Sequence, residues 1–405
     1  MVSRHLVHCR GCGRRLVLRI QVSAGLSPDD PRTVQPFLFA CPACRSGMHG
    51  ALHGGQSSPS LAGEDFDAAD GEAAPGDLVV SIATDVPVHA SLSGGRADDV
   101  LLTSYIKVVS MIGPEVAAEV VEAVGTLRGL REAASPYLRR GVDRYLEGDL
   151  SGAIDAAAAA FEDRPTEVNL EAGPLLRAFL EDLYRPLGGG DAIDAALAET
   201  EAIARAAEAR NATATAALLG ALESGPLPEH RKRVLDTALR VLADVDALTP
   251  ALWSELLEAR LPAEELPALR VMRDDFDVLK SRYQDVCELG SRTLAMIAPF
   301  ANIARRGEVR SFADGQRRTL KDALGARAAV REGWLVDLPA VRVLFDAVAR
   351  RTRNDIGHRL VRYDFNSGDL VYDAGAPETY LDFVVDYLNA ARLSRYLADT
   401  ALRLS

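Results

Sequence analysis

Long apolar runs and an excess of positive charge are both missing from this sequence of 405 residues. No apolar run approaches the ~20 residues that a membrane-spanning helix needs, so we expect no contact with a membrane. The segment from Met1 to His5 lacks the apolar stretch of a secretory signal, and we therefore expect a cytoplasmic protein. The formal net charge is −12, which excludes a protein that coats nucleic acid over its whole surface. Any contact with RNA or DNA must therefore depend on a local patch.

Sequence motifs of several common enzyme classes are also missing. The three glycines at 188–190 are not followed by Lys-Ser or Lys-Thr and do not follow an expected strand, so they do not form a phosphate-binding loop. Neither a Gly-x-Ser-x-Gly motif nor a dinucleotide-binding fingerprint is present. These absences disfavour NTPases, α/β-hydrolases and nicotinamide-dependent dehydrogenases.

The residues that are abundant favour helix. Aromatic residues make up only 6% of the chain, so its core must consist mainly of aliphatic side chains, and Ala, Leu, Glu and Arg are common. We predict a mainly α protein with a helical middle region, a C-terminal helical bundle and a small N-terminal β domain. The expected division is 1–53 for the β domain, 54–76 for a flexible linker, 77–262 for a short β segment and the helical middle region, and 263–405 for the bundle.

Four of the five cysteines form two C-x-x-C pairs near the N-terminus. These four are Cys9, Cys12, Cys41 and Cys44. Two such pairs in a reducing compartment are typical of a tetrahedral Cys₄ zinc site, in which each tight turn supplies two thiolates. Short strands are expected at 16–20, 36–39 and 48–52, and the whole resembles a zinc ribbon. A closed Cys₄ site has a structural role and supplies no metal for catalysis.

The N-terminal domain also carries several basic residues, so two roles remain open for it. It could be purely structural, or its basic edge could contact nucleic acid or a protein partner. The residues of this edge are Arg4, Arg10, Arg14, Arg15 and Arg19. The middle helices are a second possible surface for a protein partner.

The segment 351–358, near the C-terminal end, has the most informative chemistry. Arg353 is followed directly by Asn354, and His358 comes four residues after Asn354, so the last two would share one face of a helix. A guanidinium forks onto phosphate oxygens, and an imidazole exchanges a proton near neutral pH. Together these groups could bind a phosphodiester and transfer a proton during its cleavage. Basic residues at the end of a helix could instead simply complement its dipole.

This hexapeptide resembles the signature of HEPN-domain proteins, which is Arg, a polar residue, three further residues and His. The similarity extends over about residues 270–405 and includes an expected hairpin around 363–372 before the last helix. It implies a helical bundle that forms a homodimer and cleaves RNA without a metal. By resemblance, His358 would transfer a proton at the ribose 2′-hydroxyl, Arg353 would hold the scissile phosphate, and Asn354 would support them.

Neighbouring residues extend this interpretation to substrate binding. Arg350 and Arg359 belong to a basic cluster around the hexapeptide, and Tyr363 could stack on an unpaired base or pack in the core. The sequence thus predicts a metal-independent endoribonuclease, and the resemblance suggests a regulated defence or toxin-like effector. The alternative is a non-catalytic HEPN-like module that dimerises and binds nucleic acid or protein.

Overall fold

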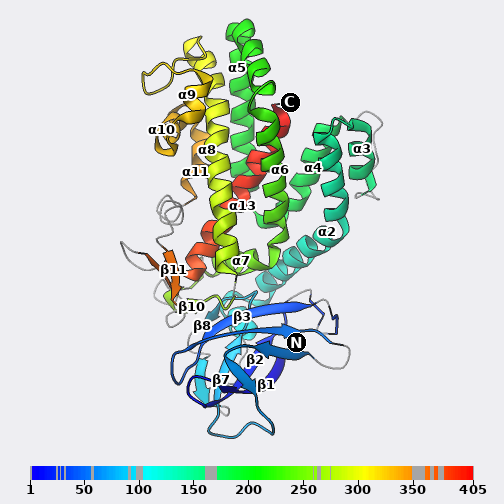
Figure 1. Cartoon of the computed structure of the whole chain (residues 1–405), viewed down its shortest axis with the longest axis vertical. Helices are drawn as coiled ribbons and strands as arrows, with labels where there is room; N and C mark the ends of the chain where they lie inside the picture. The colour runs from blue at the N-terminus through cyan, green and yellow to red at the C-terminus, as the bar shows by residue number, and fades with distance from the viewer. Residues whose placement is uncertain are drawn as a thin grey trace. The chain divides into compact units, whose positions relative to one another are not determined.

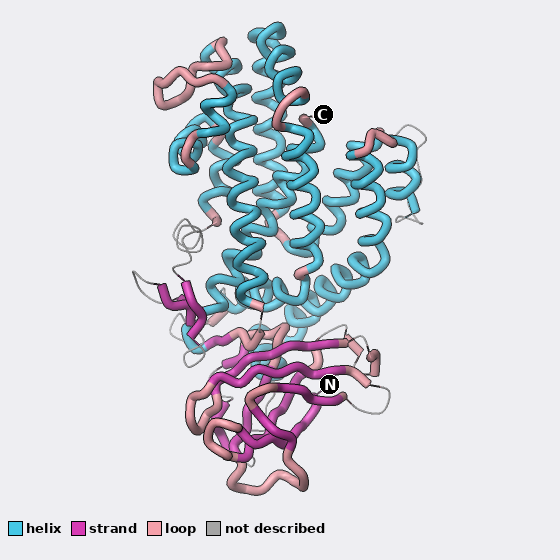
Figure 2. The backbone as a smooth tube through the Cα atoms, viewed as in Figure 1, coloured by secondary structure: helices cyan, strands magenta, loops and turns pink. Residues whose placement is uncertain are grey.

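The structure of the chain is a computed structural model (Figure 1). It describes residues 2–23, 26–27, 29–31, 33–55, 59–89, 93–96, 104–159, 171–258, 260–261, 266–273, 275–348, 361–364, 369–372 and 378–404. These residues are mainly helical and include several small sheets, which confirms the predicted fold class at that level (Figure 2). None of the described helices combines the length and the hydrophobicity needed to cross a membrane.

Two compact units make up the chain. One is drawn from Met1–Arg128, Asp244–Lys280 and Asn354–Leu388, and the other from Gly129–Ala243, Ser281–Arg353 and Asn389–Ser405. Three of the five boundaries between them fall within helices, namely α2 (Pro114–Leu146), α8 (Phe276–Arg306) and α13 (Tyr380–Arg403).

The first unit contains a five-stranded sheet with the order β6-β1-β2-β7-β9. Its strands are β1 (Val2–Cys9), β2 (Arg15–Gln21), β6 (Phe66–Ala68), β7 (Leu78–Ile82) and β9 (Ser93–Arg96). The central strand β2 pairs antiparallel with β1 and parallel with β7. Because both of its faces are covered, Leu16, Val17 and Leu18 are all buried, and β2 reads as a continuous apolar run.

A second, antiparallel sheet consists of β3 (Val34–Ala40), β4 (Gly47–His53) and β5 (Ser60–Gly63). The rings of Phe37 in this sheet and Phe66 in the first are stacked, with centroids 6.5 Å apart. A Cβ atom at Gly63 would lie 2.2 Å from the Phe66 ring, so only glycine allows this close approach. The strands β2, β3 and β4 confirm the three strands expected around the cysteine pairs.

The segment 54–76, expected to be a flexible linker, differs from that expectation in two stretches. It contributes β5, which pairs with β4, and β6, which pairs with β1. Its small and polar residues suggested a linker, but Phe66 packs between the sheets and orders the segment. The short β segment expected from residue 77 supplies β7 to the first sheet and β8 (Val88–His89), which pairs with β10 (Leu269–Arg270).

The remainder of the first unit joins segments that are distant in the sequence. It includes α1 (Ser104–Ile112), α7 (Val245–Glu258), the 3₁₀ turn η3 (Leu266–Ala268), and a sheet of β11 (Val361–Asp364), β12 (Asp369–Tyr372) and β13 (Glu378–Thr379). Arg273 donates to the carboxylate of Asp275 at 2.6 Å, and Asp275 accepts from the hydroxyl of Tyr380 at 2.5 Å. This buried network ties the segment before α8 to the start of α13.

The second unit is a helical bundle (Figure 1). Besides parts of α2, α8 and α13, it contains α3 (Leu150–Ala159), α4 (Ala172–Tyr184), η2 (Arg185–Leu187), α5 (Gly190–Glu223), α6 (Leu227–Ala243), α9 (Leu320–Gly325), α10 (Ala328–Gly333), η4 (Trp334–Asp337) and α11 (Pro339–Asp346). The helices are joined by buried polar contacts as well as by apolar ones. For example, the hydroxyl of Tyr184 lies 3.0 Å from the carbonyl oxygen of Ala238 and 2.8 Å from Oγ of Ser394.

The expected boundary at 262/263 also differs from the structure. Leu218 and Leu222 of α5 share one core cluster with Met296, Phe300 and Ile303 of α8. The helices of the expected middle region and those of the expected C-terminal bundle therefore form a common core. Apolar periodicity shows that a helix has a face to bury, but it does not show which helix covers that face.

Candidate metal centre and the predicted nuclease residues

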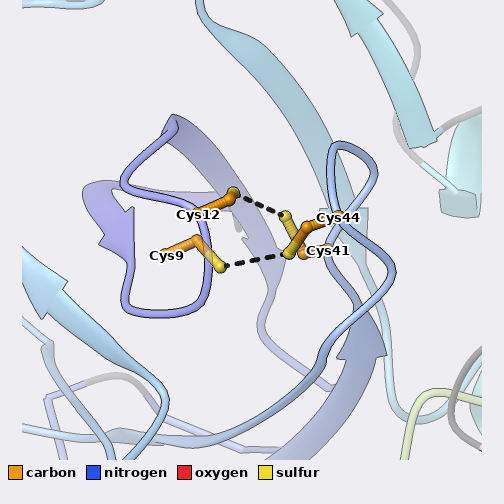
Figure 3. A group of neighbouring side chains, drawn as sticks. All are labelled: Cys9, Cys12, Cys41 and Cys44. Carbon is orange, nitrogen blue, oxygen red and sulfur yellow. Dashed lines mark hydrogen bonds between the residues drawn. The ribbon is translucent and has the colours of Figure 1, made fainter.

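The four N-terminal cysteines converge on one point from two loops (Figure 3). Their sulfur atoms all lie within 4.8 Å of one another, with 3.8 Å between those of Cys9 and Cys44 and 3.9 Å between those of Cys12 and Cys41. Four thiolates around one zinc ion at about 2.3 Å would place the sulfurs about 3.8 Å apart. The cluster thus has the dimensions of a tetrahedral metal site, as the cysteine spacing predicted.

The two loops that carry the cysteines share one hydrogen-bond pattern. In the first, Gly13 N–H donates to Cys9 O, and Cys9 N–H donates to Arg14 O. In the second, Arg45 N–H donates to Cys41 O, and Cys41 N–H donates to Ser46 O. The equivalent residues Gly13 and Arg45 have φ of 69° and 65°. Each loop therefore turns through a left-handed residue, which is usual for glycine and costly for arginine.

The thiols of the cluster differ in acidity before any metal binds. The side-chain hydroxyl of Ser46, 3.3 Å from the Cys44 sulfur, and the Ser46 backbone lower the pKa of Cys44 to about 6. Burial raises the pKa of Cys41 to about 12, and burial also raises the pKa of Cys9. A divalent cation would offset the cost of ionising the buried thiols, so metal binding must release protons.

The expected basic edge of this domain is largely neutralised. Arg10 forms a 2.7 Å ion pair with Asp67, and Arg15 forms one of the same length with Asp77. Hydrogen bonding to these arginines holds the pKa of each aspartate below its ordinary value. Arg19 is buried, with 7% of its surface exposed. Arg4 and Arg14 remain exposed, and two arginines make a much weaker attraction for nucleic acid than the five the sequence suggested.

The residues of the predicted nuclease motif lie outside the described residues. These are Arg350, Arg353, Asn354, His358 and Arg359, and their convergence remains a prediction. The helix that comes before the motif, α11, begins at Pro339 and ends at Asp346. A carboxylate oxygen of Glu199 accepts from the amides of Ala340 and Val341 at 2.9 and 3.0 Å, which satisfies two donors at the start of α11.

Tyr363 is described, and it lies in the three-stranded sheet that follows the motif. It pairs with Leu370 of β12, is half-buried, and packs edge to face on Tyr380 with ring centroids 5.5 Å apart. Tyr372 of the same hairpin is buried, and its hydroxyl donates to Glu378 at 2.5 Å. Tyr372 therefore belongs to the core, whereas Tyr363 is only partly buried.

A second group of polar residues had no signal in the sequence. Arg177, Arg231 and Arg403 line one cavity of the second unit although they come from helices that are distant in the sequence.

No protein-family model matches the chain, and no curated protein or solved structure is significantly similar to it. Function must therefore be inferred from this chain's own residues.

Proposed function

We propose that this protein is a metal-independent endoribonuclease of the HEPN type that acts as a homodimer. The observation that carries the proposal is the sequence Arg353-Asn354-Asp355-Ile356-Gly357-His358. In the proposed reaction, the 2′-oxygen of a ribose attacks the adjacent phosphorus and the bond from phosphorus to the 5′-oxygen breaks. The products are a 2′,3′-cyclic phosphate and a free 5′-hydroxyl, so neither a metal nor a co-substrate is consumed.

The residues of the motif divide the work by their chemistry. His358 takes the proton of the 2′-hydroxyl or gives one to the departing 5′-oxygen, because an imidazole can do either near pH 7. Arg353 neutralises the charge that develops on the phosphate oxygens, and Asn354 holds its neighbours in orientation. Arg350 and Arg359 would contact flanking phosphates, and Tyr363 would stack on a base.

Three features of the described residues support this proposal. The chain is mainly helical, the motif is preceded by α11, and it is followed by the β11–β12 hairpin and then by the long helix α13. This is the order of elements expected from the resemblance. Tyr363, which comes five residues after His358, retains the partial exposure that stacking requires.

We further propose that the four cysteines bind one zinc ion in a structural role, in a zinc-ribbon-like domain. Cysteine thiolates in a tetrahedral arrangement favour zinc over calcium or magnesium, which prefer oxygen. All four coordination positions would be filled by sulfur, so the ion has no open position for a water nucleophile. Catalysis would then be independent of the metal.

The test compares wild type with Arg353→Ala/His358→Ala on single-stranded RNA, with Arg342→Ala as the control. Arg342 is an exposed arginine of α11 that pairs only locally with Asp346, so its loss tests for a general effect of charge. We expect cleavage in EDTA with cyclic-phosphate ends, a loss of at least about 100-fold in the double variant, and no change in the control. The zinc content is measured after the EDTA incubation, so that loss of the structural ion is recognised.

Two outcomes would overturn the nuclease proposal. One is cleavage that persists in His358→Ala, and the other is cleavage that requires added Mg²⁺ while the zinc is retained. RNA binding or dimerisation without any product would instead favour the non-catalytic binding module.

A further inference from the structure

The second unit contains a cavity of about 830 Å³ that the proposed nuclease mechanism does not use. It is lined by the end of α2, by α3, by the first turns of α4 and α6, by α5 and by the last turn of α13. Ligand pockets of small molecules typically measure about 300–1,000 Å³. The cavity is therefore large enough for a ligand the size of a nucleotide.

One wall of the cavity is cationic. Arg177 of α4, Arg231 of α6 and Arg403 of α13 line it, and their side chains are only 25%, 12% and 26% exposed. Partial burial weakens screening by water, so an anion placed here interacts more strongly than at an open surface. The planar guanidinium also matches the paired oxygens of a phosphate or a carboxylate.

The three arginines differ in how far the protein already satisfies them. Arg231 donates to Glu223 at 2.7 Å and to the carbonyl oxygen of Ala401 at 3.1 Å, and Arg403 is paired with Asp399 and Glu201.

Arg177 has fewer hydrogen bonds and ion pairs with the described residues than the other two arginines. Among the residues that the structure describes, its nearest carboxylate oxygen is that of Asp399, 3.9 Å away and beyond hydrogen-bonding distance. Its buried Nε has no hydrogen-bond partner among the described residues. A buried donor without a partner costs about 1–3 kcal/mol, so the protein compensates this guanidinium less than those of Arg231 and Arg403. A ligand oxygen would bind the part of the Arg177 side chain that is still exposed.

Other residues that line the cavity are apolar. Leu146 at the end of α2 and Leu150 and Ile154 of α3 line it, together with Pro174 of α4. The Leu150 side chain has a large exposed surface, since the residue is 53% exposed. A ligand that covers it would gain the free energy of removing apolar surface from water.

From these two sets of lining residues we propose that the cavity binds a small organic anion, with a phosphate or carboxylate on Arg177 and an apolar or aromatic body on Leu150 and Ile154. Two carboxylates, Glu171 and Glu201, also line the cavity, and Glu201 pairs with Arg403. The anion is therefore expected on Arg177, whose guanidinium is the least paired of the three among the described residues.

The experiment is isothermal titration calorimetry of the full chain with four organic probes and inorganic phosphate. The organic probes are adenosine monophosphate and octanoate, with adenosine and octanol as their uncharged counterparts. We expect at least one organic anion to bind at least tenfold more tightly than its uncharged counterpart and than inorganic phosphate. Preference for the nucleotide would assign a phosphate ligand, and preference for octanoate would assign a carboxylate.

Variants test whether the binding occurs in this cavity. Arg177→Gln keeps part of the aliphatic stem but removes the charge, and it should weaken binding of the anion at least tenfold. Leu150→Asp, which replaces an apolar lining residue, should have an effect of the same size. Arg185→Ala is the matched control, because Arg185 follows directly on α4 but is 67% exposed and pairs with Asp182. Circular dichroism verifies that each variant is folded. The proposal fails if none of the organic anions binds, if inorganic phosphate binds as tightly, or if the folded Arg177→Gln and Leu150→Asp variants bind like wild type.

Discussion

A buried histidine in the helical bundle should make the stability of the second unit depend on pH. His230 of α6 is 5% exposed, and its Nε2 lies 2.9 Å from Oγ1 of Thr293. That hydroxyl donates its own proton to the carbonyl oxygen of Leu289, so it accepts from His230 Nε2–H. The neutral ring therefore carries its proton on Nε2, and a second proton would have to enter at Nδ1, which has no partner among the described residues.

The protonated ring is costly in this environment. Burial first, and then the nearby charges of Arg292 and Arg233, lower the pKa of His230 to about 4 from its ordinary value of 6.5. Between these two pH values the unfolded chain binds a proton that the folded chain excludes, so stability falls as the pH falls. The loss amounts to about 2 kcal/mol at pH 5 and approaches about 3 kcal/mol near pH 4.

The assay is urea unfolding at pH 7, 6 and 5 of a Trp253→Phe background, so that the fluorescence reports on Trp334, which is buried in the same unit as His230. His230→Gln is the reference, because glutamine can still donate to Thr293 but does not titrate. Asp399 titrates in the same range with the opposite sign, since burial raises its pKa to about 6, and it affects both proteins equally. Only the difference between the two proteins therefore reports on His230. Equal losses of stability between pH 7 and pH 5 in wild type and His230→Gln would refute the reasoning.

Three further predictions concern the β domain and the motif. Purified protein should contain about one zinc per chain, and Cys41→Ser should lose it and destabilise the domain, as measured by mass spectrometry of the metal and by proteolysis. Gly63→Ala should cost about 1–3 kcal/mol in urea unfolding, because the added methyl overlaps the Phe66 ring, whereas Arg45→Gly should stabilise by up to about 1 kcal/mol. If the protein is a toxin-like effector, its induced expression should arrest growth, and His358→Ala should relieve the arrest.

Each of these predictions has a result that contradicts it. A metal-free wild type that resists proteolysis as well as the zinc-loaded protein would exclude a structural zinc. Gly76→Ala is the control for the glycine, because a Cβ there meets nothing within 4 Å, and an equal cost at both positions would exclude the steric cause. Growth arrest that is equally strong with His358→Ala would separate the toxicity from the motif.

The sequence by itself determined the local parts of this structure. Two C-x-x-C turns, each between short β-branched or aromatic runs, need only neighbouring residues to form, so the strands β2, β3 and β4 were predictable. The approach of Cys9 to Cys44, 35 residues apart, was predictable for another reason, because a tetrahedral metal ion needs four ligands. Helical content follows in the same way from the abundance of Ala and Leu, because helix propensity is a property of nearby residues. The HEPN-type motif is also local, and its function remains a prediction.

Long-range partners were decided only by the tertiary structure. Phe66 shows why, since its small, polar surroundings suggested a linker, yet one ring packing on Phe37 recruits the segment into two sheets. Likewise, Arg10 looked like part of a basic edge until folding placed Asp67 beside it. Arg177 and Arg403 carry no shared pattern in the chain, and they line one cavity because buried apolar faces, whose partners no local rule specifies, assemble the helices that hold them.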